Sequence, residues 1–505
     1  MFDADFAVAA RDAYPERRRD AGLGRLEPLG RAVWTYVGRT LAARAPAAFA
    51  TTLAGPARDG DLALAAAALR RRLGHRQHAE DARLRLLAMG ARAAVLGGLG
   101  EPSTDTLRAA WTMLAGAVAD LPPGADACTA TVLAGGTAAG RGLPVHLLAE
   151  DDQGAAALAD RAAAILPRLG LTVAGIGART GEPERRDAYA ADVVCAPLQV
   201  LAFDYLRDRV RMGRRLGALR HRMAAADGGS PLRGLLMRGL GHGFAVNADG
   251  IMVDRAHTPL VLRDDPQAEQ PAMLARLSLP DFLGRYLGLG GCAPAAAFSA
   301  RDFRRLYGMP VVGGGTRLPA IGEVYADRAE KWRAIAARAV EARHAGRLVL
   351  VGVASADDAE ALAALLEARG LACRRPGAPA SDAPDPADAV LILPDRFAAP
   401  PCPAGPVSLI LAQGFPGGRL DGRLVAAVHR QTADARCACL FSIDDEVIAF
   451  GGAGWPGGHL RAASLRRWFY RRAQARAGRR ETEVRVGLLQ YDRHLDNVLA
   501  FAGEG

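Results

Sequence analysis

Apolar residues recur every three or four positions through the first part of the chain, in segments rich in alanine, leucine and arginine. Two examples run from Leu62 to Leu73 and from Arg83 to Leu96. This spacing places the apolar side chains on one face of a helix. We therefore expect residues 1–119 to form a helical N-terminal region.

A different pattern begins near residue 143, where short apolar runs alternate with stretches of helical spacing. The apolar runs are residues 143–148, 171–177, 191–197, 347–355, 389–394, 407–413 and 439–443. Strands that alternate with helices are typical of a parallel sheet in an α/β fold. Because the alternation occurs twice, we predict two α/β units in tandem. The predicted bounds are 120–265 for the first unit, 266–300 for a short linker, 301–450 for the second unit and 451–505 for a helical end.

The net charge is +10, and the basic side chains are nearly all arginine, since Lys331 is the only lysine in the chain. Basic runs occur at residues 17–19 and 70–72. They contain no interleaved aromatic residues, which sites for single-stranded nucleic acid use for stacking. We therefore favour solvated helix faces over contact with RNA or anionic lipid, and nucleic acid is not an expected partner.

The cysteine pattern and the apolar runs indicate the compartment. The seven cysteines are scattered and include no C-x-x-C pair, so we predict neither a disulfide framework nor a metal site. The longest uncharged run, residues 397–418, contains five prolines and is a poor membrane span. The first residues carry acids and lack the apolar core of a signal peptide. We expect a cytoplasmic protein.

A set of motifs in a specific order then points to a family. ERRDAYAADVV (184–194) is followed by FDYLRD (203–208), DRAHTPLVL (254–262) and RLDGRLVAAVHRQ (419–431). Over roughly residues 80–495 the chain resembles the SecA family of preprotein-translocation ATPases. The residues that match the family signatures, for which the resemblance implies structural roles, are Arg186, Tyr189, Asp192, Phe203, Asp204, Tyr205, Arg207, Asp208, Thr258 and Pro259.

The resemblance implies two RecA-like domains of the P-loop NTPase and helicase type, with ATP and magnesium bound between them. It also implies a preprotein-binding domain inserted between the two motor domains. In this sequence a short segment, which we expect to be the linker 266–300, stands in that place.

The phosphate-binding loop of the family departs most from its pattern. The family sequence G-x-G-K-T falls just before Thr129, where this chain has PGADAC (123–128), with Gly124 and Asp126 but no lysine. A P-loop uses its lysine on the phosphates and its hydroxyl on magnesium. A second glycine-rich stretch, residues 135–142, has arginine in place of the lysine and precedes a strand, so we do not favour phosphate binding there.

The other motifs of the nucleotide cleft are also altered. The family's D-E-V-D aligns with residues 246–249 and leaves only Asp249, and D-E-A-R leaves Asp254. The arginine motif aligns with residues 425–431 and keeps only Arg430 and Gln431. We therefore expect a degenerate nucleotide cleft without intact catalytic residues, metal or cofactor. We further expect that its apolar replacements, such as Ala248 and Val428, hold the two domains in one arrangement.

Three functional hypotheses follow. The first is a pseudo-ATPase adaptor in protein export that binds a secretion substrate, the translocon or a dedicated accessory protein. Such an adaptor would stay in the cytoplasm or contact the inner face of the plasma membrane peripherally. The second is an active translocase that uses ATP and magnesium with divergent residues. The third is a nucleic-acid-binding relic of the helicase-like fold.

Overall fold

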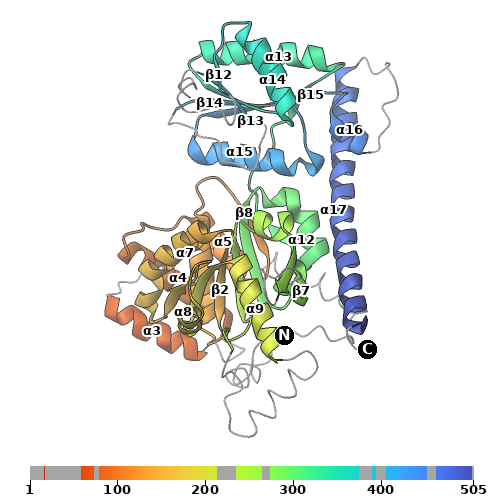
Figure 1. Ribbon diagram of the computed structural model, residues 1–505. Helices are drawn as coiled ribbons and strands as arrows, with labels where there is room; N and C mark the ends of the chain where they lie inside the picture. Colours follow the sequence, from red (N-terminus) through yellow and green to blue (C-terminus); the bar gives the residue numbers. More distant parts are fainter. Residues whose placement is uncertain are drawn as a thin grey trace.

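The structure is a computed structural model that describes Glu16 and residues 59–72, 79–212, 235–263, 273–374, 389–393, 405–451 and 462–502. The expected helices before residue 59 and the basic run 17–19 lie outside the described residues. Figure 1 shows two α/β domains, one above the other, with a long C-terminal helix along one side. The predicted fold class, two tandem RecA-like domains, is confirmed.

In the described part of the chain, the first domain is built on a seven-stranded sheet in the order β3-β4-β2-β5-β8-β1-β9. Its strands are β1 (Val118–Leu121), β2 (Val145–Ala149), β3 (Val173–Gly175), β4 (Val193–Pro197), β5 (His242–Val246), β8 (Gly288–Pro294) and β9 (Val311–Val312). Every pairing is parallel. The apolar runs fit this arrangement because a parallel sheet is covered by helices on both faces.

Helices surround this sheet in the α/β manner. The helices of the first domain are α3 (Asp59–Arg72), α4 (Ala79–Leu96), α5 (Thr104–Leu114), α6 (Ala127–Ala139), α7 (Asp152–Ile165), α8 (Glu182–Ala188), α9 (Leu198–Met212), α11 (Leu279–Leu283) and α12 (Ala300–Tyr307). Short helical turns are η2 (Leu166–Leu169), η3 (Asp249–Asp254) and η4 (Ala296–Ser299). The N-terminal helices α4 and α5 share one core with α6, so they cover the first sheet instead of forming a separate region.

The segment 266–300 differs from the expected linker. After an antiparallel arm of β6 (Pro259–Arg263) and β7 (Met273–Ser278), it supplies β8, which lies between β5 and β1 in the middle of the sheet. The run GLGGCAP has too few apolar side chains to indicate a strand. A Cβ on Gly290 would lie 2.4 Å from the Met113 carbonyl oxygen, so the close approach of α5 requires glycine there.

The second glycine-rich stretch lies inside a buried helix. Gly135 and Gly136 belong to α6, where added Cβ atoms would meet Leu147 and Leu166 at 2.6 and 2.4 Å. These glycines let α6 pack closely on β2 and on the turn after α7. They do not form a phosphate-binding loop.

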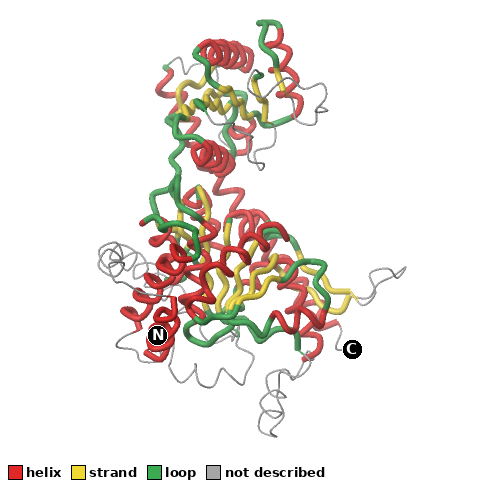
Figure 2. The backbone as a smooth tube through the Cα atoms, turned by 90° about the vertical axis from the view of Figure 1, so that its left-hand side faces the viewer, coloured by secondary structure: helices red, strands yellow, loops and turns green. Residues whose placement is uncertain are grey.

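Among the described residues, the second domain has a six-stranded parallel sheet in the order β10-β15-β14-β11-β13-β12. The strands are β10 (Ile321–Tyr325), β11 (Leu348–Gly352), β12 (Cys373–Arg374), β13 (Val390–Leu393), β14 (Val407–Leu411) and β15 (Ala435–Ser442). Its helical elements are α13 (Arg328–His344), α14 (Ala356–Glu367), η5 (Pro416–Gly418), α15 (Arg419–Gln431) and α16 (Glu446–Phe450). Figure 2 shows α15 at the bottom of this domain, facing the first domain.

The 40-residue helix α17 (Ala463–Ala502) connects the two domains from one side (Figure 1). Its first half packs on the second domain through the buried residues Tyr470, Ala473 and Ala477. Farther along, Leu489 packs against Ala256 and Leu306 of the first domain. Helix α17 therefore packs against both domains and connects them along one side.

Candidate functional site

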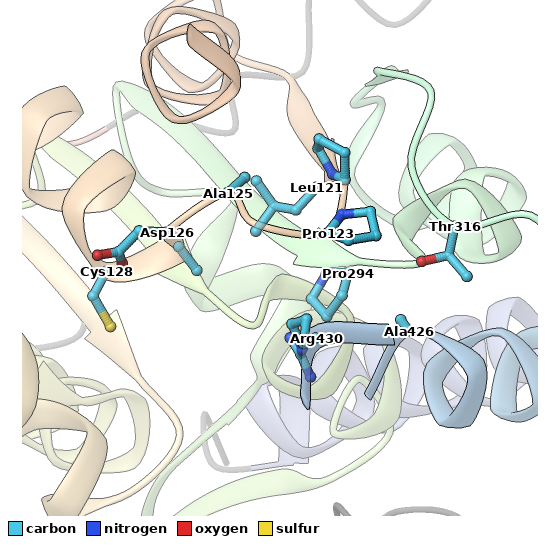
Figure 3. A pocket seen from close by; sticks show the side chains of 11 residues that line it. Leu121, Pro123, Ala125, Asp126, Cys128, Pro294, Thr316, Ala426 and Arg430 are labelled. Atoms are coloured by element: carbon cyan, nitrogen blue, oxygen red, sulfur yellow. The ribbon is translucent and has the colours of Figure 1, made fainter. Parts of the chain in front are cut away.

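The candidate site lies between the carboxyl end of β1 and helix α15. Figure 3 shows a pocket of about 220 Å³ in which the loop after β1 and the start of α6 face α15. Its lining residues are Leu121, Pro122, Pro123, Ala125, Asp126, Ala127, Cys128, Pro294, Thr316, Ala426 and Arg430. Pockets that enclose an organic ligand usually measure ~300–1,000 Å³. This pocket is smaller.

The N-terminus of α6 is occupied by a side chain of the protein itself. Asp126 is the N-cap residue, and its carboxylate accepts hydrogen bonds from the Thr129 backbone N–H at 3.0 Å and the Thr129 hydroxyl at 2.8 Å. Free N–H groups and the helix dipole make such a terminus attractive to phosphate. Here the negative charge at the helix N-terminus is already supplied by the Asp126 carboxylate, which caps the helix.

Arg161 of α7 completes this arrangement. Its Nη1 donates to the Asp126 carboxylate and, at 2.8 Å, to the Thr129 hydroxyl. Gly124, in the loop before α6, has a φ of +87° with open space around it. Glycine at this position therefore serves the left-handed backbone of the loop. The charges at the α6 terminus are paired within the first domain.

A second group of charges joins the two domains. Asp249 and Asp254 are the ends of η3, the π-helical turn that follows β5. Arg423 of α15 donates to both carboxylates, through Nε to Asp249 and through Nη1 to Asp254. Arg419, one helical turn earlier on the same face, also pairs with Asp254. Because the Asp249 side chain is only 1% exposed, its pairing with Arg423 lies in a protected environment.

Helix α17 extends this charge network. Glu481 accepts from Arg419 at 3.4 Å and also from Arg485. Arg485 in turn donates to Asp302 of α12 at 3.0 Å. Burial raises the pKa of Asp302, while the Arg485 guanidinium opposes that rise. Burial also lowers the pKa of Arg419 to about 10. The network therefore ties the first domain, the second domain and α17 together.

The predicted cleft residues fall into separate places. Arg430 of α15 and Asp126, the N-cap residue of α6, both line the pocket (Figure 3). Asp249 and Asp254 pair with Arg423 and Arg419, which the sequence analysis did not select. Gln431 is the last residue of α15 and is exposed. Gly124 precedes α6 but is not among the lining residues.

The apolar replacements do not hold the domains together in the way we expected. Ala248 packs in the core of the first domain, and Val428 packs in the core of the second. An apolar contact that does cross the cleft is made by the ring of Phe298 against Gly422, where an added Cβ would lie 2.5 Å from the ring. Among the described residues, ion pairs and this ring contact contribute to the joint, and Ala426 lines the pocket between the domains.

The family-signature residues build the frame of the first domain. Asp204 is fully buried and accepts from the Tyr189 hydroxyl, Arg185 and Arg207, each at 2.8 Å. Arg185 therefore has the role that we assigned to its neighbour. Arg186 is instead exposed and pairs with Glu182 at 3.2 Å. In a short helix that exposes most of its surface, the sequence does not say which of two adjacent arginines faces inward.

The remaining signature residues make local contacts. Asp208 accepts from the backbone N–H groups of Leu236 and Met237 at 2.7 and 2.9 Å, and burial raises its pKa to about 6. Other contacts join Tyr205 to Glu16 and Asp192 to Thr172. Phe203 packs against the core of the first domain. Thr258 donates its backbone N–H to the Arg255 carbonyl, and Pro259 is the first residue of β6.

Six residues of the charge networks were not predicted from the sequence: Arg161, Asp302, Arg419, Arg423, Glu481 and Arg485. The four-residue spacing of Arg419 and Arg423 was the available signal. Their partners in the first domain, Asp249 and Asp254, lie more than 160 positions away, so spacing alone does not identify them.

The fold and the joint define a class of protein. Two RecA-like domains that meet at the ends of their parallel strands are the frame of helicase-like motors. Within the residues that the structure describes, no helix combines the length and apolar character needed to cross a membrane.

Comparison with known proteins shows similarity to one family. The SecA DEAD-like domain matches residues 50–279. Protein translocase subunit SecA 2 of Bordetella avium is 25% identical over 572 aligned residues, which cover 81% of this chain and 84% of that protein. Protein translocase subunit SecA 3 of Magnetococcus marinus is 31% identical over 31% of this chain and 24% of its own length. Over most of its length the chain is similar to proteins of the SecA family.

Among solved structures, S. cerevisiae Dbp5 bound to RNA and ADP BeF3 is similar over 70% of this chain and 87% of that chain. The sequence identity is 13% and the TM-score is 0.37.

Proposed function

We propose that this chain is a pseudo-ATPase adaptor in protein export, a subunit that binds partners through a fixed two-domain frame and does not hydrolyse ATP. Similarity to a family whose relatives are named protein translocase subunits supports the place in export. The observation that carries the proposal is the pairing of Arg423 with Asp249 and Asp254 across the cleft.

The residues present do not fit a magnesium–nucleoside triphosphate. Magnesium requires free carboxylate oxygens, but Asp249 and Asp254 are engaged by guanidinium groups. Removing one partner from a buried ion pair costs about 3–5 kcal/mol, which nucleotide binding would have to supply first. Phosphate would also meet the Asp126 carboxylate at the α6 terminus, and the nearby cation that the structure describes there, Arg161, is already paired with that carboxylate.

Without nucleotide-driven closure, the two domains have no ligand that favours one arrangement over another. The network from Asp302 through Arg485 and Glu481 to Arg419 supports a single arrangement instead. A rigid frame suits a subunit that presents binding surfaces to a secretion substrate, the translocon or an accessory protein. We place it in the cytoplasm, with peripheral contact at the inner face of the plasma membrane.

Phosphate release by the purified protein with magnesium and ATP tests this proposal. We expect no turnover above background, and no change in melting temperature when millimolar ATP and magnesium are added. An active SecA ATPase assayed in parallel is the control. Turnover on the order of 1 per second that is lost in Arg430→Ala would support an active translocase instead.

A second measurement tests the role in export. Deleting the gene should reduce secretion of a subset of proteins, while the purified chain alone should not drive translocation in a reconstituted channel. Translocation by this chain alone would contradict the adaptor role. Salt-dependent binding to RNA with no secretion defect would favour the nucleic-acid alternative.

A further inference from the structure

Helix α17 carries a row of exposed apolar side chains beside the first domain. Val484, Leu488 and Tyr491 are 57%, 47% and 64% exposed. Their spacing of four and then three residues places them on one face of the helix. Single exposed apolar residues are common on protein surfaces, but a row on one helix face is typical of a binding surface.

The opposite face of the helix is fixed, so the row cannot turn inward. Leu489 is buried against Ala256 and Leu306, and Arg485 is held by Asp302. Figure 1 shows α17 at the edge of the molecule, with both domains on one side of it. The row is therefore presented to solvent on a rigid helix.

The charge next to the row specifies the partner. Between residues 463 and 491, α17 has eight arginines and two acidic residues. The acidic residues are paired, Glu481 with Arg419 and Arg485 and Glu483 with Arg301, so the helix keeps an excess of positive charge. Arg480 lies four positions before Val484 and continues the row toward the N-terminus of the helix. Gly487 lies beside the row, and a Cβ there would meet nothing within 4 Å, so another helix has room to approach closely.

We propose that Arg480, Val484, Leu488 and Tyr491, the α17 row, bind an acidic amphipathic helix of a partner protein. The partner packs its apolar side on the three apolar residues and places carboxylates beside Arg480 and the arginines before it. This inference rests on the proposed adaptor function, for which it names the docking surface. A second copy in parallel would bring two arginine-rich segments together, which like charges disfavour.

Two synthetic 21-residue peptides test the chemistry on the full-length protein. In both peptides, leucines are spaced alternately four and three residues apart. The remaining positions are alanine and glutamate in one peptide, and alanine and lysine in the other. In fluorescence anisotropy, we expect the glutamate peptide to bind with a Kd on the order of 10 μM. The lysine peptide should bind at least about tenfold more weakly, and added salt should weaken the glutamate peptide.

Two variants locate the binding. Leu488→Glu should weaken the glutamate peptide about tenfold or more, because it places a charge in the apolar row. Gln490→Glu is the matched control: it adds the same charge two positions away, at an exposed residue outside the row, and should change binding less than about twofold. Circular dichroism of both variants checks that the fold is retained.

Several outcomes would overturn the inference. These are equal binding of the two peptides, equal effects of the two variants, or no binding of the glutamate peptide. A dimer in light scattering that Leu488→Glu dissociates would assign the row to a second copy. Capture by anionic vesicles that Leu488→Glu abolishes, without peptide binding, would assign it to lipid.

The same preparations separate this inference from the proposed function. ATP turnover with intact peptide binding would overturn the pseudo-ATPase and leave the α17 row in place. If the protein neither turns over ATP nor binds the glutamate peptide, the proposal for the α17 row is wrong and the pseudo-ATPase proposal stands.

Discussion

Arg423 donates through Nε to the carboxylate of Asp249, which lies 174 positions away in the sequence and on the other side of the domain cleft. The Asp249 side chain is 1% exposed and the Arg423 side chain 14%. Both charged groups are largely shielded from water, so the ion pair between them offsets the cost of burying each charge. The pair therefore acts as a joint between the domains.

Arg423→Ala should reduce the free energy of unfolding by about 3–5 kcal/mol, because it leaves the Asp249 carboxylate buried without its partner. Urea denaturation measures this loss, and hydrogen exchange should increase in α15 and η3. Arg436→Ala, which removes an exposed arginine from the same domain, is the control and should change stability by less than about 0.5 kcal/mol. Equal effects of the two changes would argue against the joint.

Asp126→Ser tests the carboxylate at the α6 terminus. Serine keeps an N-cap hydroxyl, so the helix should lose less than about 1 kcal/mol. The change also releases Arg161 from its ion pair and removes a negative charge from the place where phosphate would lie. We expect millimolar pyrophosphate to raise the melting temperature of this variant but not of the wild type. An Arg161→Ala, Asp126→Ser double variant should lose the effect. If the wild type responds equally, the Asp126 carboxylate does not exclude phosphate.

Gly315→Ala tests the connection between the domains. A Cβ at Gly315 would lie 2.5 Å from the Asp120 carboxylate, which accepts the Gly315 N–H at 2.8 Å. We expect a loss of about 1–3 kcal/mol from overpacking, measured by thermal and urea unfolding. Gly314→Ala is the adjacent control, since a Cβ there meets nothing within 4 Å. Similar losses for both would mean that backbone flexibility, and not the contact with Asp120, matters.

The pH dependence of stability should report Asp208. Burial raises the pKa of this carboxyl from the ordinary 3.8 to about 6, so the folded protein binds more protons than the unfolded chain between these values. The contribution of Asp208 to stability is therefore largest below pH 4 and is lost as the pH rises through 6. The stability of the wild type relative to Asp208→Asn should fall by up to about 3 kcal/mol from pH 4 to pH 7. A difference independent of pH would contradict this assignment.

Lys331 offers a chemical probe of unfolding, because it is the only lysine and its side chain is 2% exposed. Its Nζ donates to the Asp445 carboxylate at 2.6 Å. Burial lowers the pKa of Lys331, which favours the reactive free amine, but the site is closed to reagents. We expect an amine-reactive ester to modify Lys331 about a thousandfold more slowly in the folded protein than in urea. Mass spectrometry measures this ratio, and comparable rates would show that the second domain opens readily.

Local patterns in the sequence were sufficient for the fold class and the family resemblance. The apolar runs 143–148 and 347–355 are short and lie next to segments of helical spacing, and they correspond to the interior strands β2 and β11. The absence of a lysine before Thr129 is also a property of the sequence alone. These features depend only on residues that are close together in the sequence, so they can be recognised without the structure.

The tertiary structure alone decided where the glycine-rich strand β8 lies and which charges meet. Gly290 belongs to a central strand because the backbone of α5 passes within reach of it, and no local pattern encodes that contact. Arg423 and Asp249 are brought together by packing of two separate domains. The sequence therefore determined that no lysine precedes Thr129, and the tertiary structure determined that Arg423 of the second domain pairs with Asp249 of the first. The physical reason is that ion pairs between distant residues depend on the relative position of packed elements, which local propensity does not specify.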